Sequence, residues 1–135
     1  MAEIKKALIV DDDEVNNFIC VRQIRAAKFA EDAEFMITGR EALDSLRAAI
    51  NNDPEALPDV IFLDINMPMM NAWEFLEEYT ALSEKFTKPV KLFILSSSVY
   101  RKDQTKAFEH SVVTDYLYKP LTKELLNKVK EKHFS

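Results

Sequence analysis

The stretch Val60-Ile61-Phe62-Leu63-Asp64-Ile65-Asn66-Met67-Pro68 decides how this chain folds. Its first four residues are apolar and follow Pro58 and Asp59, a pattern typical of a strand that is buried on both faces. Strands of this kind belong mainly to parallel sheets that helices cover on both sides. Asp64 follows the strand directly, so the sequence predicts a carboxylate at the carboxyl end of a parallel strand.

Three further apolar runs end in polar residues in the same way. They are Ala7-Leu8-Ile9-Val10 before Asp11-Asp12-Asp13, Leu92-Phe93-Ile94-Leu95 before Ser96-Ser97-Ser98, and Tyr116-Leu117-Tyr118 before Lys119-Pro120. Ligands of open parallel sheets bind in the crevice beyond the carboxyl ends of the strands. Four strands would therefore bring carboxylates, a hydroxyl and an ammonium to one edge, where they can hold a divalent cation and a phosphoryl group.

Helical patterns alternate with the strands to the end of the chain. We expect helices at about residues 14–28, 39–50, 72–82 and 102–109 and from 122 onward, and a short strand at 34–38. The first helix is expected to point Val15, Phe18, Ile19 and Ile24 inward. Strands interleaved with helices predict an α/β fold with a doubly wound, five-stranded parallel sheet, in one domain over residues 1–135.

Composition narrows the classes of function. The 135 residues are 47% hydrophobic and 30% charged, and the net charge is −5 without a basic stretch, which argues against direct binding of nucleic acid. Cys20, the only cysteine, has no partner for an internal disulfide, as is usual in a reducing compartment. The chain shows no signal peptide and no apolar run of about 18 residues. We expect a soluble, cytoplasmic protein without membrane insertion.

The acidic residues at the strand ends suit magnesium. Carboxylates brought together repel one another, and a cation offsets that repulsion. Mg²⁺ prefers oxygen ligands and takes one or two carboxylates, so we expect Asp12 and Asp64 as direct ligands, Asp11 holding a bound water, and the backbone carbonyl of Asn66. An aspartate can also act as the nucleophile in phosphoryl transfer. In that case Lys119 would neutralise phosphoryl oxygens and Ser96 would donate a hydrogen bond.

Each of these residues has a plainer interpretation when it is taken alone. Acids after strands are commonly helix caps, which is our expectation for Asp13. A lysine before proline is commonly solvated, and three serines make an ordinary polar loop. Trp73 and the methionines 67, 69 and 70 are expected in packing or on a partner surface. The functional interpretation rests on the coincidence of complementary groups at four strand ends.

Together the motifs resemble the receiver domain of two-component response regulators. The matching stretches, which span nearly the whole chain, are Leu8–Asp13, Asp64–Pro68, Leu95-Ser96 and Tyr116–Pro120. The resemblance implies a flavodoxin-like (βα)5 fold and a protein that is not an enzyme in the usual sense. It implies that a histidine kinase or histidine phosphotransfer protein phosphorylates Asp64, with Mg²⁺ bound, and that a downstream protein target reads the result. A homodimer on phosphorylation also agrees with the resemblance.

The same resemblance implies roles for the remaining site residues. Lys119 matches the family's lysine, Ser96 the switch hydroxyl, and Tyr116 the aromatic residue that turns inward after phosphorylation. The stretch from Ser96 to Lys119 is about one residue longer than is common, so Ser97 stays an alternative for the switch. Ala72 stands where the family commonly has glycine, which suggests a different loop geometry.

Two other functions agree with parts of the pattern. One is a phosphohydrolase of the haloacid dehalogenase type with Asp64 as its nucleophile. Such sites carry a second acid two residues further on, and here that residue is Asn66. The other is a degenerate receiver that acts as an interaction module without phosphorylation, which the presence of all the acids and Lys119 argues against.

Overall fold

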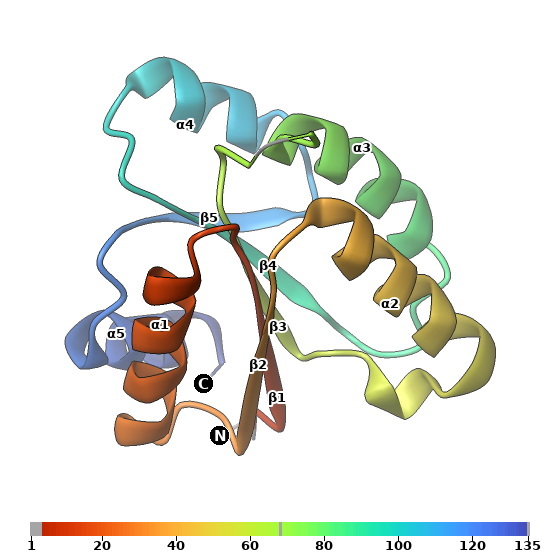
Figure 1. The fold of residues 1–135 in the computed structure, drawn as a ribbon, viewed down its shortest axis with the longest axis horizontal. Coiled ribbons are helices and arrows are strands. Elements are labelled where there is room, and N and C mark those ends of the chain that lie inside the picture. Colours follow the sequence, from red (N-terminus) through yellow and green to blue (C-terminus); the bar gives the residue numbers. More distant parts are fainter. Residues whose placement is uncertain (1–3, 68, 135) are drawn as a thin grey trace.

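The structure, a computed structural model, describes residues 4–67 and 69–134, so Pro68 of the quoted motif lies outside the described residues. The strands are β1 (Lys6–Val10), β2 (Asp32–Met36), β3 (Val60–Leu63), β4 (Lys91–Ser96) and β5 (Val113–Tyr118). The helices are α1 (Glu14–Ala26), α2 (Gly39–Asn52), α3 (Ala72–Ser83), α4 (Arg101–Phe108) and α5 (Lys123–His133), and a 3-10 turn, η1, covers Pro54–Ala56. Figure 1 shows helices on both sides of the sheet.

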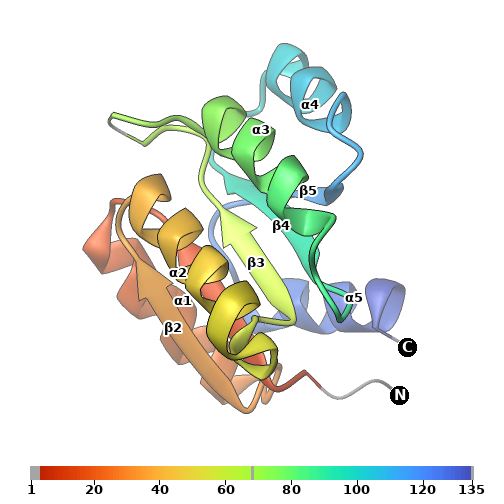
Figure 2. The ribbon, with the colours of Figure 1, turned by 90° about the vertical axis from the view of Figure 1, so that its right-hand side faces the viewer.

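The five strands form one parallel sheet in the order β2-β1-β3-β4-β5. This is the flavodoxin-like order, and it confirms the predicted doubly wound fold. The chain winds first from β1 outward to β2 and then crosses to β3, which puts the carboxyl ends of β1 and β3 side by side. Figure 2 shows β3 in the middle of the sheet with the other strands on its two sides. The switch in winding direction is therefore at the edge that carries Asp11 and Asp64.

Two apolar clusters form the core, one on each face of the sheet. One cluster joins Leu8, Val10, Ile61 and Leu63 to α2, α3 and α4, and the other joins Ala7, Ile9, Val60 and Phe62 to α1 and α5. Alternate strand residues point to opposite faces, so β1 and β3 contribute to both clusters. Full burial of a large apolar side chain contributes roughly 1.5–3 kcal/mol, so these strand residues contribute to stability on both faces of the sheet.

The predicted orientation of α1 was wrong for three of its four residues. Ile24 is buried, but Val15, Phe18 and Ile19 are exposed. The buried face of α1 consists instead of Asn17, Cys20 and Ile24, which recur at helical spacing. The inward face contains a polar residue and the outward face contains apolar ones. The hydrophobic pattern therefore predicted the wrong buried face for this helix.

Side-chain caps fix where most helices begin. Asp13, Thr38, Asn71 and Thr122 each accept a hydrogen bond from a backbone N–H in the first turn of their helix. The expectation that Asp13 is a cap is therefore confirmed. The predicted strand 34–38 lies two residues earlier, at Asp32–Met36, because Ile37 and Thr38 lead into α2.

Strand β5 contains one residue more than the facing part of β4. Leu92 pairs with Val113, but Phe93 pairs with Asp115, so Thr114 is an extra residue of the kind that makes a β-bulge. Beyond this irregularity Ser96 pairs with Tyr118 in regular register. The register is thus regular again where β5 approaches Lys119. Within residues 4–67 and 69–134, no helix is long and apolar enough to cross a membrane.

Candidate functional site: an acidic cluster at the carboxyl ends of β1 and β3

Asp11, Asp12 and Asp64 form a cluster at the predicted edge of the sheet. One carboxylate oxygen of each lies within 4.8 Å of the others. The backbone N–H of Asp64 donates to the carbonyl of Val10 over 3.0 Å, which ties the end of β3 to the end of β1. Asp11 and Asp64 are buried, whereas Asp12 is exposed. The cluster is therefore open to solvent on the side of Asp12.

Lys119 brings a positive charge into this cluster. Its Nζ lies 2.8 Å from Oδ2 of Asp11 and 3.4 Å from Oδ1 of Asp64. The Lys119 backbone N–H donates to the carbonyl of Ser96 over 2.9 Å, which holds the residue beside the end of β4. Burial opposes the charged form, but the bond to Asp11 and the charges of Asp64 and Asp11 outweigh it, so the pKa of Lys119 lies above its ordinary value.

The electrostatics of Asp64 differ from those of an ordinary aspartate. Burial, together with the charge of Asp11, raises the pKa of Asp64 to about 6, although Lys119 opposes the shift. One ammonium does not balance three carboxylates at this edge of the sheet. A divalent cation with oxygen ligands would complete the balance, and the donor set fits Mg²⁺. Asn66, the predicted carbonyl ligand, is exposed two residues after Asp64.

The structure adds two asparagines that sequence reasoning missed. Asn16 Nδ2 donates to Oδ2 of Asp11 over 2.9 Å, and Asn17 Nδ2 donates to the Asp11 carbonyl over 2.8 Å. The Asp13 backbone N–H also donates to Oδ1 of Asp11. Asp11 thus accepts side-chain or backbone hydrogen bonds at both carboxylate oxygens. Two asparagines in the first turns of a helix that follows an acidic strand end were the available signal.

The predicted switch residues lie together at the end of β4. Ser96 is buried and its Oγ accepts the Ser98 backbone N–H over 3.0 Å, whereas Ser97 is exposed. Tyr116 is buried in the same structure, with 8% of its surface exposed, and its hydroxyl donates to the Ser98 carbonyl over 3.0 Å. The aromatic ring therefore already occupies an inward position.

The loop between β3 and α3 takes its strained conformation at Met69 and not at Ala72. Met69 has a φ of 70° and is almost fully exposed. Ala72 is the first residue of α3 and is fully buried. Ala72 thus stands where the family commonly has glycine, but its backbone is helical and not left-handed. Met70 packs against Gly39 at the start of α2, where an added Cβ would lie 2.8 Å from the Met70 Sδ.

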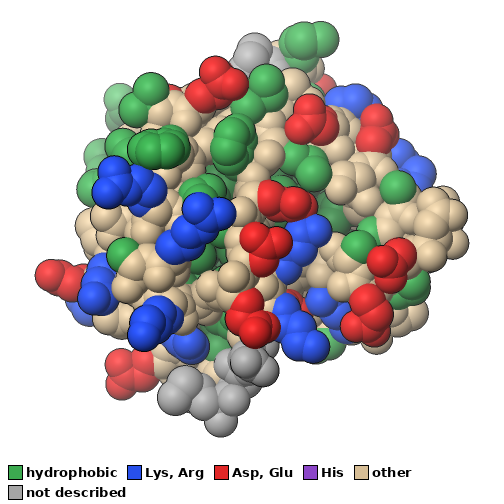
Figure 3. All heavy atoms as spheres, turned by 60° about the horizontal axis from the view of Figure 1, so that its bottom comes forward, with side chains coloured by type: hydrophobic (Ala, Val, Ile, Leu, Met, Phe, Trp, Pro, Cys, Tyr) green, Lys and Arg blue, Asp and Glu red, His purple; other side chains and the backbone are tan. Residues whose placement is uncertain are grey.

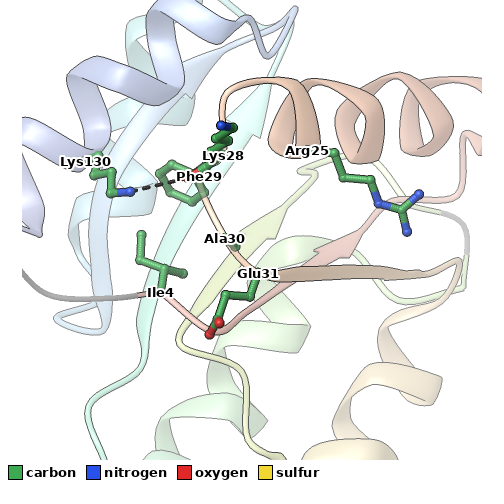
Figure 4. A pocket seen from close by; sticks show the side chains of 7 residues that line it. All are labelled: Ile4, Arg25, Lys28, Phe29, Ala30, Glu31 and Lys130. Atoms are coloured by element: carbon green, nitrogen blue, oxygen red, sulfur yellow. Dashed lines mark hydrogen bonds between the residues drawn. The ribbon is translucent and has the colours of Figure 1, made fainter.

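A hollow of about 340 Å³ lies at the opposite edge of the sheet. Figure 4 shows its lining, which comes from the segments before β1 and β2, the end of α1, and α5: Ile4, Arg25, Lys28, Phe29, Ala30, Glu31 and Lys130. The Lys130 ammonium donates to the Lys28 carbonyl across this hollow. The hollow shares no residue with the acidic cluster, so it is a separate surface feature.

Comparison with known proteins agrees with the geometry. The family model of the response regulator receiver domain matches residues 7–130. A two-component response regulator from Cytophaga hutchinsonii superposes with a TM-score of 0.86 and 31% identity, covering 96% of each chain.

Two curated relatives are more distant in sequence. Hybrid signal transduction histidine kinase L of Dictyostelium discoideum is 28% identical over 95% of this chain, which spans only 7% of that protein's length. The probable methanogenesis regulatory protein FilR2 of Methanothrix harundinacea is 27% identical over 92% of this chain and 77% of its own. With the acidic cluster, the lysine and the sheet order in place, the chain belongs to the response regulator receiver domain family of two-component signalling.

Proposed function

We propose that this receiver domain accepts a phosphoryl group on Asp64 from a histidine kinase or histidine phosphotransfer protein. The observation that carries the proposal is the setting of Asp64, which lies within 4.8 Å of Asp11 and Asp12 and 3.4 Å from the Lys119 ammonium. Phosphoryl transfer requires mainly positioning and compensation of oxygen charge, and these groups supply both.

The transfer forms one bond and breaks one. A carboxylate oxygen of Asp64 attacks the phosphorus atom, the P–O bond forms, and the P–N bond to the donor imidazole breaks. The imidazole leaves with the electron pair and takes up a proton. Asp64 attacks in its ionised form, which its pKa of about 6 leaves predominant at neutral pH. Lys119 stays close enough to neutralise the oxygens of the transferred group.

Asp12, Asp64 and the carbonyl of Asn66 would hold Mg²⁺, with Asp11 acting through a bound water. When bound, the ion supplies positive charge to the phosphoryl oxygens. Asp11 suits the indirect role, because its carboxylate already accepts hydrogen bonds from Asp13, Asn16 and Lys119. Asp12 suits the direct role, because it is exposed at the open side of the cluster.

Ser96 is the switch hydroxyl in this proposal, and Ser97 is not. The buried position of Ser96 beside the backbone of Lys119 supports the choice. Phosphorylation would draw the Ser96 hydroxyl to the new charge and favour the inward Tyr116, so that a population already present increases. The surface of α4, β5 and α5 would then be read by a downstream protein target or by a second copy of the chain. The domain acts as a signalling module and not as an enzyme.

The exposed apolar face of α1 suits the docking of the phosphodonor protein. Val15, Phe18 and Ile19 are exposed one to two turns after the acidic cluster, and Phe35 of β2 lines one hollow together with Phe18. Figure 3, which brings the lower side of Figure 1 forward, shows hydrophobic side chains gathered beside Lys and Arg side chains. An apolar patch with a charged rim is typical of a protein-binding surface.

Transfer from a radiolabelled phosphohistidine protein tests the proposal. The wild-type chain is expected to take up the label in the presence of Mg²⁺, and Asp64→Asn is expected to take up none. Peptide mapping should place the label on the peptide that contains Asp64. Label on Asp64→Asn would mean that another residue accepts the phosphoryl group. No uptake of label by the wild-type chain, together with no Mg²⁺ binding, would favour a receiver that works without phosphorylation.

A further inference from the structure

Ser98 is the point at which the switch residues and helix α4 meet. Its backbone N–H donates to Oγ of Ser96, and its carbonyl accepts the Tyr116 hydroxyl. Its own hydroxyl donates to the carboxylate of Asp103, which lies in the first turn of α4. One residue thus bonds to β4, to β5 and to α4 through three different groups.

Asp103 is placed to act through this residue. Helix α4 begins after Tyr100, which makes no side-chain cap, so the first turn is held without the usual capping residue. Asp103 stands at the position where a capping box would place an acid, but it accepts the Ser98 hydroxyl. A hydrogen bond to an ionised acceptor is stronger than one between neutral groups, so the contact holds the loop against the helix.

The same end of α4 also contacts β5 on the outside. The side-chain amide of Gln104 donates to the Tyr118 hydroxyl, and the rings of Tyr116 and Tyr118 meet edge to face at 5.6 Å between centroids. The inward ring of Tyr116 is therefore linked to α4 twice, through Ser98 and through Tyr118. A shift of the first turn of α4 would disturb both links.

We propose that Asp103 is a positioning residue that couples α4 to the inward state of Tyr116 through the Ser98 hydroxyl. The Asp103 carboxylate fixes Ser98, and Ser98 presents the carbonyl that Tyr116 needs when its ring is buried. By linkage, a partner that binds α4 in this arrangement stabilises the inward Tyr116. Loss of the hydrogen bond from Ser98 to Asp103 increases the population of the outward Tyr116. The relevance of this coupling to signalling rests on the proposed function.

The test uses the unphosphorylated full chain with 3-fluorotyrosine at position 116. Fluorine NMR with a soluble paramagnetic agent reports how far the ring is exposed to solvent. Asp103→Ala and Ser98→Ala are each expected to lower the inward-to-outward ratio by about tenfold, in line with the loss of a charge-assisted hydrogen bond. The double variant should match the single variants because both remove the same contact. Glu109→Ala, which removes a carboxylate at the other end of α4, is the control and should match the wild type.

Two results would overturn the proposal. One is an unchanged Tyr116 signal in both single variants. The other is a change in Asp103→Ala but not in Ser98→Ala, since that pattern would mean that Asp103 acts only on the helix end. The measurement needs no phosphorylation, so it decides the coupling even if Asp64 takes up no phosphoryl group. If Asp64 is phosphorylated, the rate with acetyl phosphate should fall in both variants and stay unchanged in Glu109→Ala.

Discussion

The Lys119 ammonium lies 3.4 Å from a carboxylate oxygen of Asp64, although 54 residues separate the two in the sequence. The ammonium is closer to Asp11, at 2.8 Å, so it serves two buried carboxylates at once. This shared counter-ion leaves Asp64 incompletely neutralised, which agrees with its raised pKa. The site therefore has excess negative charge, which a bound Mg²⁺ can neutralise.

Asp64→Asn is expected to be more stable than the wild type at neutral pH without Mg²⁺. The pKa of Asp64 is raised to about 6 in the folded state, so between its ordinary value and 6 the folded protein holds a proton that the unfolded chain has lost. Folding stability of the wild type thus falls as pH rises through this window, and Asp64→Asn avoids the loss, with a gain of about 1–3 kcal/mol above pH 6. Urea unfolding of both proteins from acidic to neutral pH measures the difference.

Mg²⁺ provides the control for this prediction. It should stabilise the wild type at neutral pH and should stabilise Asp64→Asn much less, because the variant lacks one ligand. A stability difference that stays constant across pH, and does not respond to Mg²⁺, would contradict the electrostatic account of Asp64.

Lys119→Met is expected to bind Mg²⁺ more tightly and to transfer phosphate more slowly. Loss of the ammonium removes its repulsion of the incoming ion, and we expect the Mg²⁺ affinity to rise by about tenfold. The same loss removes the charge that neutralises the phosphoryl oxygens. Isothermal titration calorimetry measures the affinity, and Lys123→Met on the exposed start of α5 is the matched control. Equal Mg²⁺ affinity in Lys119→Met and wild type would argue that the ion binds elsewhere.

Gly39→Ala and Met70→Ala are expected to be energetically coupled. A Cβ at Gly39 would meet the Met70 Sδ at 2.8 Å and the Phe75 ring at 3.3 Å. Alanine favours the helix by up to about 1 kcal/mol, so the single variant should be close to neutral, with crowding offsetting that gain. In the Met70→Ala background the same change should be stabilising. Additive effects in denaturant unfolding would show that Met70 moves aside freely.

Phe18→Ser is expected to slow phosphorylation by a protein donor while leaving phosphorylation by acetyl phosphate unchanged. Phe18 is exposed on α1 and is not part of the acidic cluster, so the change should affect only the binding of the donor protein. We expect the rate of transfer from the donor protein to fall by about tenfold, as for loss of a central apolar contact. Phe108→Ser, which changes another exposed phenylalanine on α4, is the control for general surface changes. A matching loss with both donors would indicate damage to the site itself.

Much of the fold and the site could be predicted from the sequence for one physical reason. The runs that end at Val10 and Leu63 are buried on both faces, and their carboxyl ends must meet at the switch in winding direction, so Asp11 and Asp64 come together in any parallel sheet of this order. Lys119 follows by the same argument, because β5 lies beside β4.

The rest depended on packing that a pattern does not encode. The buried face of α1 was predicted wrongly because its outward face is apolar. Asn17 can be buried on the inward face because its side chain donates a hydrogen bond to the Asp11 carbonyl. Likewise, the Thr114 bulge and the link from Ser98 to Asp103 arise from the register of β5 and the start of α4. Neither leaves a periodic signal in the sequence.

The most direct test of the account is the intact mass of the protein after incubation with acetyl phosphate and Mg²⁺. The account predicts one phosphoryl adduct that is labile to base, requires Mg²⁺ and is absent from Asp64→Asn. An adduct that persists in Asp64→Asn would contradict the assignment of Asp64 as the phosphoacceptor.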